Sequence, residues 1–322
     1  MSRKASPERA SHAARPAHSG GHALAPLAAL ALLTVIWGLS VPMMKLGLRD
    51  IPAAGLVTLR YLAAAPCFAV MLAGRPLPHR RNLAAMAALG LFGIDAGQFS
   101  QMLGVQLTSA AVATMITAII PVLTVLLASL RLRQQIRPPH IVGFALALGG
   151  IAIAISAPAG TLPVSAAAVS SARALGGEAL VLLSAFCIAG YYVLSVEVAA
   201  REGVIVTAAW SSIIAAAGLL PVAFFTVPAS EIHLTPRAIF VVLYLGLAVT
   251  VLGIWIWLHA LSRLPARIAG ASQYGQPLVG IAAAALLFGD RLDLRFLTGT
   301  ALVLAGIGFS AVPGRGTGRT RA

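Results

Sequence analysis

Charged residues are scarce in this sequence. They make up 10% of the 322 residues, against 59% for hydrophobic residues, and nine of them are acidic. Soluble domains carry about 25% charged and about 45–50% apolar residues. So few polar groups cannot cover a surface that faces water, which argues against a soluble domain and makes lipid the expected solvent. The length allows about ten spans of about 20 residues.

Cysteine is nearly absent as well. Cys67 and Cys187 both lie inside apolar runs, where we expect them to pack as small residues. A disulfide framework or a zinc site is therefore unsupported, and we expect no metal and no other cofactor. The sequence also lacks H-E-x-x-H, G-x-S-x-G and paired intramembrane aspartates. A polytopic membrane enzyme therefore has no positive signature and stands only as an alternative.

Long apolar runs are what the sequence has instead. Because lipid cannot satisfy a bare backbone, each run is predicted to be a helix. The ten runs cover residues 23–47, 54–73, 83–104, 109–130, 140–157, 177–199, 205–227, 238–261, 267–288 and 295–312.

The basic residues lie mainly between these runs. With the N-terminus placed inside, 16 of the 23 Lys and Arg residues fall in inner segments and five in outer segments, while Lys45 and Arg60 lie within spans. An excess of Lys and Arg marks cytoplasmic loops. The count predicts that both termini are cytoplasmic, and it accounts for the net charge of +14 without a nucleic-acid partner.

The chain contains an internal repeat. The segments that begin at Pro121 and Pro277 align at an offset of 156 residues. Matched pairs are Pro121 with Pro277, Gly143 with Gly299, Gly150 with Gly306 and, at an offset of 155, Pro66 with Pro221. Five helices is an odd number, so the second copy must cross the membrane in the opposite sense. Inverted repeats of this kind are typical of secondary transporters.

The predicted fold is therefore an all-α integral membrane protein, with ten transmembrane helices in two inverted five-helix repeats. The predicted segments are a disordered cytoplasmic tail (1–22), a first repeat (23–157), an outer loop (158–176), a second repeat (177–312) and a cytoplasmic C-terminal tail (313–322).

Several segments resemble a known family. IWGLSVPMMKLGL in the first helix and TLRYLAAAP, with Arg60, in the second resemble EamA-type drug/metabolite transporters. The end of each half (a proline, small and apolar residues, a short polar turn, a glycine-rich helix) resembles the close of that family's repeated domain. The resemblance covers roughly residues 30–312 and implies a ten-helix fold that exports or exchanges small metabolites without an ATP-binding domain. The family's Gly-Glu turns are replaced by Arg133-Gln134 and Gly289-Asp290.

Polar side chains within spans are candidates for function, because Arg, Lys or Asp at a helix centre costs roughly 2.5–3.5 kcal/mol on insertion scales. Asp95 shares a face of the third helix with Gln98. We expect Asp95 to carry a proton or hold a substrate amine, or else to bond a neighbouring helix. Arg60 fits a carboxylate bidentately or pairs structurally. Lys45 is expected to reach the interface. A separate face of the third helix is expected to pack closely through Gly90, Gly93, Gly97 and Gly104.

Two helices carry matched prolines with polar residues before them. A proline removes a backbone donor and frees a carbonyl near the membrane centre. Matched interruptions in two halves predict a transporter pathway, the alternative being that the prolines only shape the helices. The residues are Thr117 and Pro121 in the fourth helix, and Gln273, Tyr274, Gln276 and Pro277 in the ninth.

Aromatic residues complete the candidate pathway. Tyr191 lies in the sixth helix, Trp37 in the first, and Trp255 and Trp257 in the eighth. The tryptophans are expected to form an aromatic wall or to pack against lipid.

These features favour a secondary transporter, which we predict to export amino acids or related amphipathic metabolites by alternating access, with protons coupled through Asp95. An uncoupled exchanger or uniporter, a channel and a membrane enzyme are the alternatives. The expected partners are a small-molecule substrate, the lipid bilayer and protons, in a monomer or homodimer. The richness in Ala, Arg and Gly suggests a GC-rich bacterium and hence the inner membrane.

Overall fold

The computed structural model describes residues 21–131, 138–155, 171–264 and 272–310. Helices make up the regular structure of these ranges, which contain no strand. Most of the predicted tails and of the predicted link between the repeats lies outside them, as do Arg133 and Gln134. Two boundaries differ from the prediction, because helices begin at Gly21, inside the segment expected to be a tail, and at Ser171, inside the segment expected to be a loop.

The helices follow one another closely along the chain, and several predicted spans consist of more than one element. In chain order they are α1 (Gly21–Gly38), α2 (Ser40–Gly47), α3 (Ala53–Leu72), α4 (Arg80–Ala88), η1 (Leu89–Asp95), α5 (Ala96–Leu107), α6 (Ala110–Thr117), α7 (Ile120–Arg131), α8 (Pro138–Ile155), α9 (Ser171–Glu202), α10 (Val204–Thr226), η3 (Ala229–Glu231), α11 (Pro236–Leu243), η4 (Tyr244–Leu252), α12 (Gly253–Arg263), α14 (Gly275–Phe288) and α15 (Leu294–Ser310).

Eight helical stretches of the described chain are long and apolar enough to cross a bilayer. They are Ala25–Gly47, Ala53–Leu72, Arg80–Leu107, Ala110–Arg131, Pro138–Ile155, Ala172–Glu202, Val204–Thr226 and Pro236–Ala260. Two shorter apolar helices, Gly275–Phe288 and Leu294–Ser310, follow them. Each of these helices overlaps one of the predicted runs, so the chain is a multi-pass membrane protein.

Two of the spanning helices contain a π-helical segment. η1 lies between α4 and α5, and η4 lies between α11 and α12. Their first residues, Leu89 and Tyr244, are 155 positions apart (244 − 89), which is the offset of one matched proline pair. In η4 the Thr250 hydroxyl donates to the carbonyl of Leu245, 2.8 Å away, five residues earlier in the chain. π-helical segments are rare and often mark functional sites.

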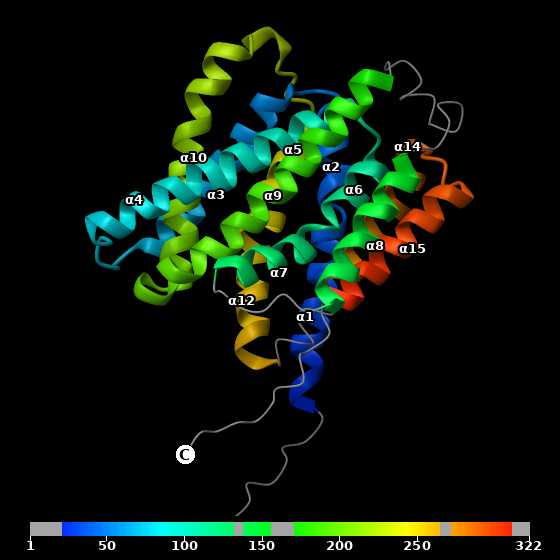
Figure 1. Ribbon diagram of the computed structural model, residues 1–322. Coiled ribbons are helices and arrows are strands. Elements are labelled where there is room, and N and C mark those ends of the chain that lie inside the picture. The colour runs from blue at the N-terminus through cyan, green and yellow to red at the C-terminus, as the bar shows by residue number, and fades with distance from the viewer. Residues whose placement is uncertain (1–20, 132–137, 156–170, 265–271, 311–322) are drawn as a thin grey trace, which may run out of the picture.

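Helices α8 and α15 pack closely because glycine faces glycine along their contact. A Cβ atom added at Gly143 would lie 2.5 Å from the Gly306 carbonyl oxygen, and one added at Gly150 would lie 2.5 Å from that of Gly299. Figure 1 shows the two helices side by side at one edge of the bundle. Small residues permit this approach between helices in a membrane, where apolar burial gives no driving force for association.

The glycine face predicted for the third helix is confirmed. A Cβ atom at Gly90 would lie 2.6 Å from the carbonyl oxygen of Ser211 in α10, and one at Gly104 would lie 2.6 Å from that of Gly177 in α9. This face therefore sets η1 and α5 against α9 and α10.

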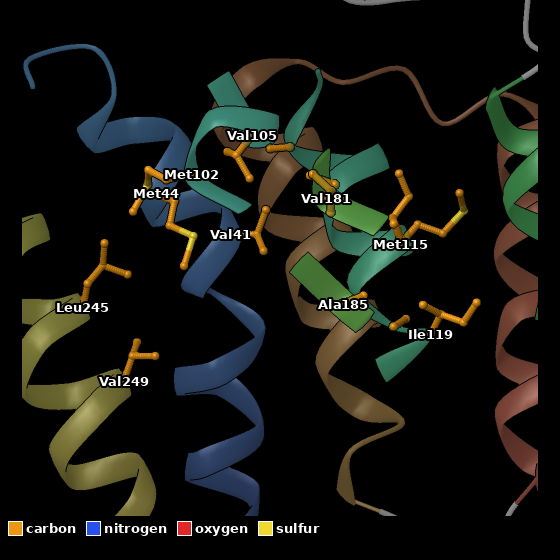
Figure 2. Packing of buried hydrophobic residues seen from close by; sticks show 14 of the residues in the cluster. Val41, Met44, Met102, Val105, Met115, Ile119, Val181, Ala185, Leu245 and Val249 are labelled. Carbon is orange, nitrogen blue, oxygen red and sulfur yellow. The ribbon is translucent and has the colours of Figure 1, made fainter. Parts of the chain in front are cut away.

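The apolar core lies where α2, α5, α6, α9 and η4 approach one another, and Figure 2 shows part of it from close by. Its labelled members are Val41, Met44, Met102, Val105, Met115, Ile119, Val181, Ala185, Leu245 and Val249. All ten are buried, and they connect elements from both halves of the sequence. The core therefore fixes the relative positions of several helices that carry the polar residues described next.

Candidate functional site

Helix breaks lie at the two matched prolines. The chain turns at residues 118–119 between α6 and α7, just before Pro121, and again at residues 273–274, just before Pro277. Because proline has no N–H, the carbonyls four residues earlier, at Thr117 and Gln273, receive no helical donor from it. Helices α6 and α14 pack together, and a Cβ atom added at Gly280 would lie 2.6 Å from Thr114 Cγ2. The two breaks therefore lie in neighbouring helices.

Polar side chains at these breaks bond mainly within their own segments. The Thr117 hydroxyl donates to the Thr114 carbonyl over 2.8 Å. Gln276 Nε2 donates to Gln273 Oε1, and the Tyr274 hydroxyl approaches the carbonyl of Ile307 in α15 at 3.4 Å. These side chains are half-buried, and the hydrogen bonds recorded for them among the described residues do not involve Asp95 or Arg60.

The tryptophans lie in different surroundings. Trp37 Nε1 donates to the carbonyl of Val249 in η4 over 3.0 Å, and the Trp37 ring lies 5.8 Å from that of Trp257. Trp255 is 52% exposed and stacks on His259 at 5.1 Å. Trp255 also lines a pocket of about 520 Å³ between α3, α10 and η4 whose side chains are otherwise mainly apolar, with Arg75 among them. The three tryptophans therefore do not form one wall.

Arg60 is the most enclosed charged group of the candidate set, with 5% of its surface exposed. Its Nη1 donates to Gln98 Oε1 over 2.7 Å, and its Nε donates to Thr250 Oγ1 over 3.1 Å. The guanidinium also lies 5.4 Å from the centre of the Tyr61 ring. The structure thus brings together Arg60 of α3 and Gln98 of α5, which the sequence singled out separately, and adds Thr250 of η4.

Asp95 ends η1, one turn before Gln98. Its side chain lies against α10, where a Cβ atom added at Gly218 would be 2.5 Å from Asp95 Oδ2. Its Oδ1 is buried and has no hydrogen-bond partner among the described residues. A membrane-embedded carboxylate without a donor is a candidate for binding a proton or a cation.

Tyrosines surround this polar cluster. Tyr191 packs against the third helix, where a Cβ atom at Gly93 would lie 2.8 Å from Tyr191 Cβ. Its ring is 6.0 Å from that of Tyr192, which is 46% exposed. The cluster therefore combines a cation, a carboxylate and aromatic rings.

Sequence reasoning missed Tyr61 and Thr250. Thr250 lies 155 residues after Asp95 (250 − 95), the same spacing that separates the starts of η1 and η4. The repeat could thus have identified Thr250 as the counterpart of Asp95 in the second half. Tyr61 carries no such signal apart from its place beside Arg60.

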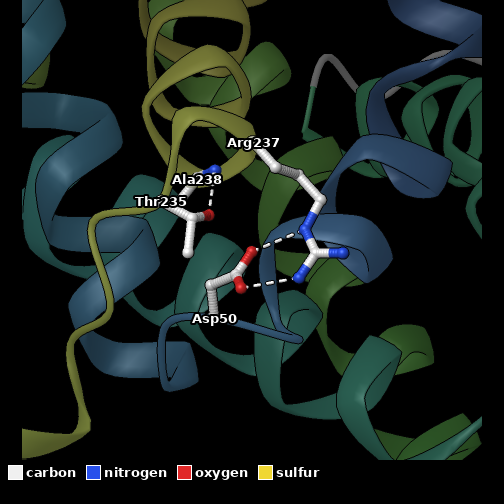
Figure 3. Close-up of polar contacts among 4 residues, drawn as sticks. All are labelled: Asp50, Thr235, Arg237 and Ala238. Atoms are coloured by element: carbon white, nitrogen blue, oxygen red, sulfur yellow. Dashed lines mark hydrogen bonds and ion pairs between the residues drawn. The ribbon is translucent and has the colours of Figure 1, made fainter.

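One end of the bundle is tied by an ion pair, shown in Figure 3. Arg237 donates from Nε to Asp50 Oδ2 over 2.7 Å and from Nη2 to Asp50 Oδ1 over 2.6 Å. The Arg237 hydrogen bonds lower the pKa of the Asp50 carboxyl below its ordinary value, against the effect of burial. The Thr235 hydroxyl accepts from Ala238 N–H and caps α11 beside this pair. The turn after α2 is thereby attached to the start of α11.

Two further charges at this end hold the turn between α5 and α6. Lys45 donates to the carbonyls of Val105, Gln106 and Thr108, at 2.8, 3.2 and 2.6 Å, so it caps the end of α5. Asp290 accepts a hydrogen bond from the Ala111 N–H, 2.9 Å away at the start of α6. It lies in one of the two turns where this sequence departs from the family's Gly-Glu. Burial raises the pKa of the Asp290 carboxyl, while that hydrogen bond and the Lys45 charge oppose the rise.

The opposite end carries looser contacts. Arg131 of α7 pairs with Glu197 of α9 at 2.8 Å, with 53% and 42% of the two side chains exposed. Asn82 of α4 donates to Glu202 Oε1 over 2.6 Å. Among the described residues, no group of three or more His, Cys, Asp and Glu side chains is placed to hold a metal ion.

Known proteins are similar to the whole membrane region. A model of the EamA-like transporter family matches residues 25–156 and again residues 175–312. A probable terminal-alkyne amino-acid exporter of Streptantibioticus cattleyicolor is 30% identical over 87% of this chain and 91% of that protein. A probable amino-acid metabolite efflux pump of Salmonella typhimurium is 28% identical over 86% and 91%. A solved structure shares the fold at 16% identity and a TM-score of 0.62, over 88% of this chain and 96% of that chain.

Proposed function

Because the chain belongs to the EamA-like transporter family, we propose that it is a secondary transporter that exports small metabolites, such as amino acids or related amphipathic compounds, by alternating access. The family and the relatives place the protein among metabolite transporters of the membrane. Two relatives carry names that refer to amino-acid export and to efflux of amino-acid metabolites. The polar cluster around Arg60 and Asp95 supports the finer proposal, since it offers partners for both charged groups of an amino acid.

The proposed architecture is ten spans in two inverted five-helix repeats. The double family match supports it, as does the 155-residue spacing between η1 and η4. The glycine contacts give a further argument. Gly143 faces Gly306, the counterpart of Gly150, and Gly150 faces Gly299, the counterpart of Gly143. This crosswise exchange is what a two-fold axis between α8 and α15 requires, and such axes relate the halves of many transporters.

In this proposal both termini are cytoplasmic, the membrane is the inner membrane of a bacterium, and the end tied by Asp50 and Arg237 faces outward. The distribution of Lys and Arg supports the orientation. Alternating access then requires the outer contacts to break while contacts at the opposite end, such as Arg131 with Glu197, close the inner side. Protons couple to this motion through Asp95, and an uncoupled exchanger or uniporter needs no such group.

The observation that carries the proposal is the Asp95 carboxylate, which lies within a membrane-spanning helix and has one oxygen without a partner among the described residues. A purely structural aspartate at this depth is expected to accept hydrogen bonds at both oxygens, because an unsatisfied charged group there is costly. A group that must bind and release a proton or a substrate cation has to keep that position open.

Purified full-length protein in liposomes, supplied with a labelled panel of amino acids and other metabolites, tests the proposal. We expect flux of at least one compound that saturates with concentration and leaves the compound chemically unchanged, compared with protein-free liposomes. Flux that rises linearly without saturation indicates a channel. Conversion of a compound into a new product indicates an enzyme, and either result contradicts the proposal.

A further inference from the structure

The positive charge of Arg60 has no acidic partner in the described part of the chain. Its recorded contacts are the Gln98 amide oxygen, the Thr250 hydroxyl and the face of the Tyr61 ring, all of which are neutral. By contrast, the ion pairs found among the described residues, Arg131 with Glu197 and Arg237 with Asp50, lie near helix ends. Arg60 is thus a buried cation that neutral acceptors hold but do not neutralise.

Such a group is poised to receive an anion. A buried charge is costly unless it is paired, and neutral acceptors offset only part of that cost. A guanidinium has five N–H donors, and two of the five bond Gln98 and Thr250. The remaining donors retain the fork that binds a carboxylate through two parallel hydrogen bonds.

A negative charge without a partner lies close by. Asp95 and Gln98 are three residues apart on one helix, a spacing that makes side chains neighbours, and Gln98 is the residue that Arg60 bonds. Asp95 Oδ1 is buried without a hydrogen-bond partner. Among the described residues, Asp95 and Arg60 nevertheless form no ion pair with each other. Gln98 thus bonds the cation and lies three residues from the carboxylate, and neither charge satisfies the other.

We propose that Arg60 and Asp95 together bind an α-amino acid as its zwitterion, with the α-carboxylate on the Arg60 guanidinium and the α-ammonium on Asp95. A structural pair is expected to close directly, whereas opposite charges that do not meet suit a ligand whose two charged groups are attached to the same carbon. Gln98 and Thr250 hold the guanidinium in place, and the rings of Tyr61 and Tyr192 offer apolar surface to the ligand's side chain. This inference rests on the proposed transport function and specifies its substrate class.

Ligands that lack one charge at a time test this assignment. The probes are L-phenylalanine, L-phenylalaninamide and 3-phenylpropionate, with leucine, leucinamide and 4-methylpentanoate as a second series. Binding is measured by equilibrium dialysis on full-length protein in nanodiscs, and flux is measured in liposomes. We expect wild-type protein to bind one of the two amino acids roughly ten- to a hundredfold more tightly than its amide or its acid, because each lost contact is a charge-assisted hydrogen bond.

Two variants, Arg60→Gln and Asp95→Asn, should each remove one of these two preferences. Arg60→Gln should bind the amino acid and its amide about equally, while it still prefers the amino acid to the acid that lacks the amine. Asp95→Asn should show the opposite pattern. Arg60→Lys, which keeps the charge but loses the fork, should recover part of the preference over the amide. Arg81→Gln, on an exposed residue of α4, is the matched control and should behave as wild type. Melting temperatures of all variants separate loss of binding from loss of folding.

The outcomes distinguish this inference from the proposed function. If wild-type protein binds all three compounds of each series equally, or binds none while it transports another metabolite, the zwitterion site is wrong and the transporter stands. If Arg60→Gln folds and keeps its preference for the amino acid over the amide, Arg60 does not receive the carboxylate. If the protein neither binds nor moves any compound of the wider panel, both proposals fail.

Discussion

The glycine contact between α8 and α15 allows a prediction of stability that uses two adjacent residues. A Cβ atom at Gly150 would lie 2.5 Å from the carbonyl oxygen of Gly299, whereas nothing lies within 4 Å of one at Gly149. Ordinary contact begins at 3.4 Å, so Gly150→Ala requires the backbones to separate locally by about 0.9 Å (3.4 − 2.5). Overpacking of this kind typically destabilises a protein by about 1–3 kcal/mol. Replacing glycine by alanine within a helix stabilises the helix by about 0.5–1 kcal/mol, which offsets part of that loss.

The net expectation for Gly150→Ala is a loss of about 1–2 kcal/mol, which corresponds to a fall in melting temperature of roughly 2–6 °C. Gly149→Ala carries the same propensity gain without the clash, so its melting temperature should stay unchanged or rise slightly. The assay is thermal unfolding of both variants and wild type in the same detergent, followed by size-exclusion chromatography. Equal melting temperatures for the two variants would refute the packing argument, because they differ only in what the added methyl group meets.

Two further predictions concern the end of the bundle tied by Asp50. Lys45→Met leaves the carbonyls at the end of α5 without their donor, so the free energy of unfolding should fall by about 1–3 kcal/mol. Arg81→Met, on the exposed face of α4, is the control and should change the free energy of unfolding little. Equal stability of the two variants would contradict the capping role. Asp50→Asn should lower the melting temperature by a few degrees at pH 7. Because the Asp50 pKa is lowered in the folded state, the ion pair with Arg237 contributes fully above the ordinary carboxyl pKa of about 3.9, and its contribution is lost as the pH falls through the lowered value. The difference between Asp50→Asn and wild type should therefore shrink below about pH 4, and a difference that grows there contradicts this assignment.

Helix positions could be predicted from the sequence, because spans must be apolar and helical whatever their neighbours are. The sequence also predicts Asp95, Gln98 and Arg60 as candidates, because a polar group within an apolar run is conspicuous. What the sequence does not contain is the partner of each group. The pairing of Arg60 with Gln98 depends on how α3 and α5 are set against each other, and periodicity is uninformative in helices that are apolar on all sides.

The π-helical segments and the role of Lys45 were not predicted for similar reasons. A π-helical segment joins each backbone N–H to the carbonyl five residues earlier instead of four, and no residue type in η1 or η4 predicts this change. Lys45 was assigned to the interface from its place near a helix end. Its three carbonyl partners belong to a turn that begins 60 residues further along the chain, a contact that only the folded structure reveals.

The central claim is that Asp95 couples transport to protons, and flux in proteoliposomes tests it most directly. Wild type, Asp95→Asn and the exposed control Glu231→Gln are compared with and without an imposed proton gradient, using the amino-acid and metabolite panel. The account predicts saturable flux that the gradient accelerates in wild type and in Glu231→Gln, and that loses its dependence on the gradient in Asp95→Asn. Wild-type flux that neither the gradient nor the Asp95 substitution changes would contradict the claim and would assign the protein to uncoupled exchange or uniport.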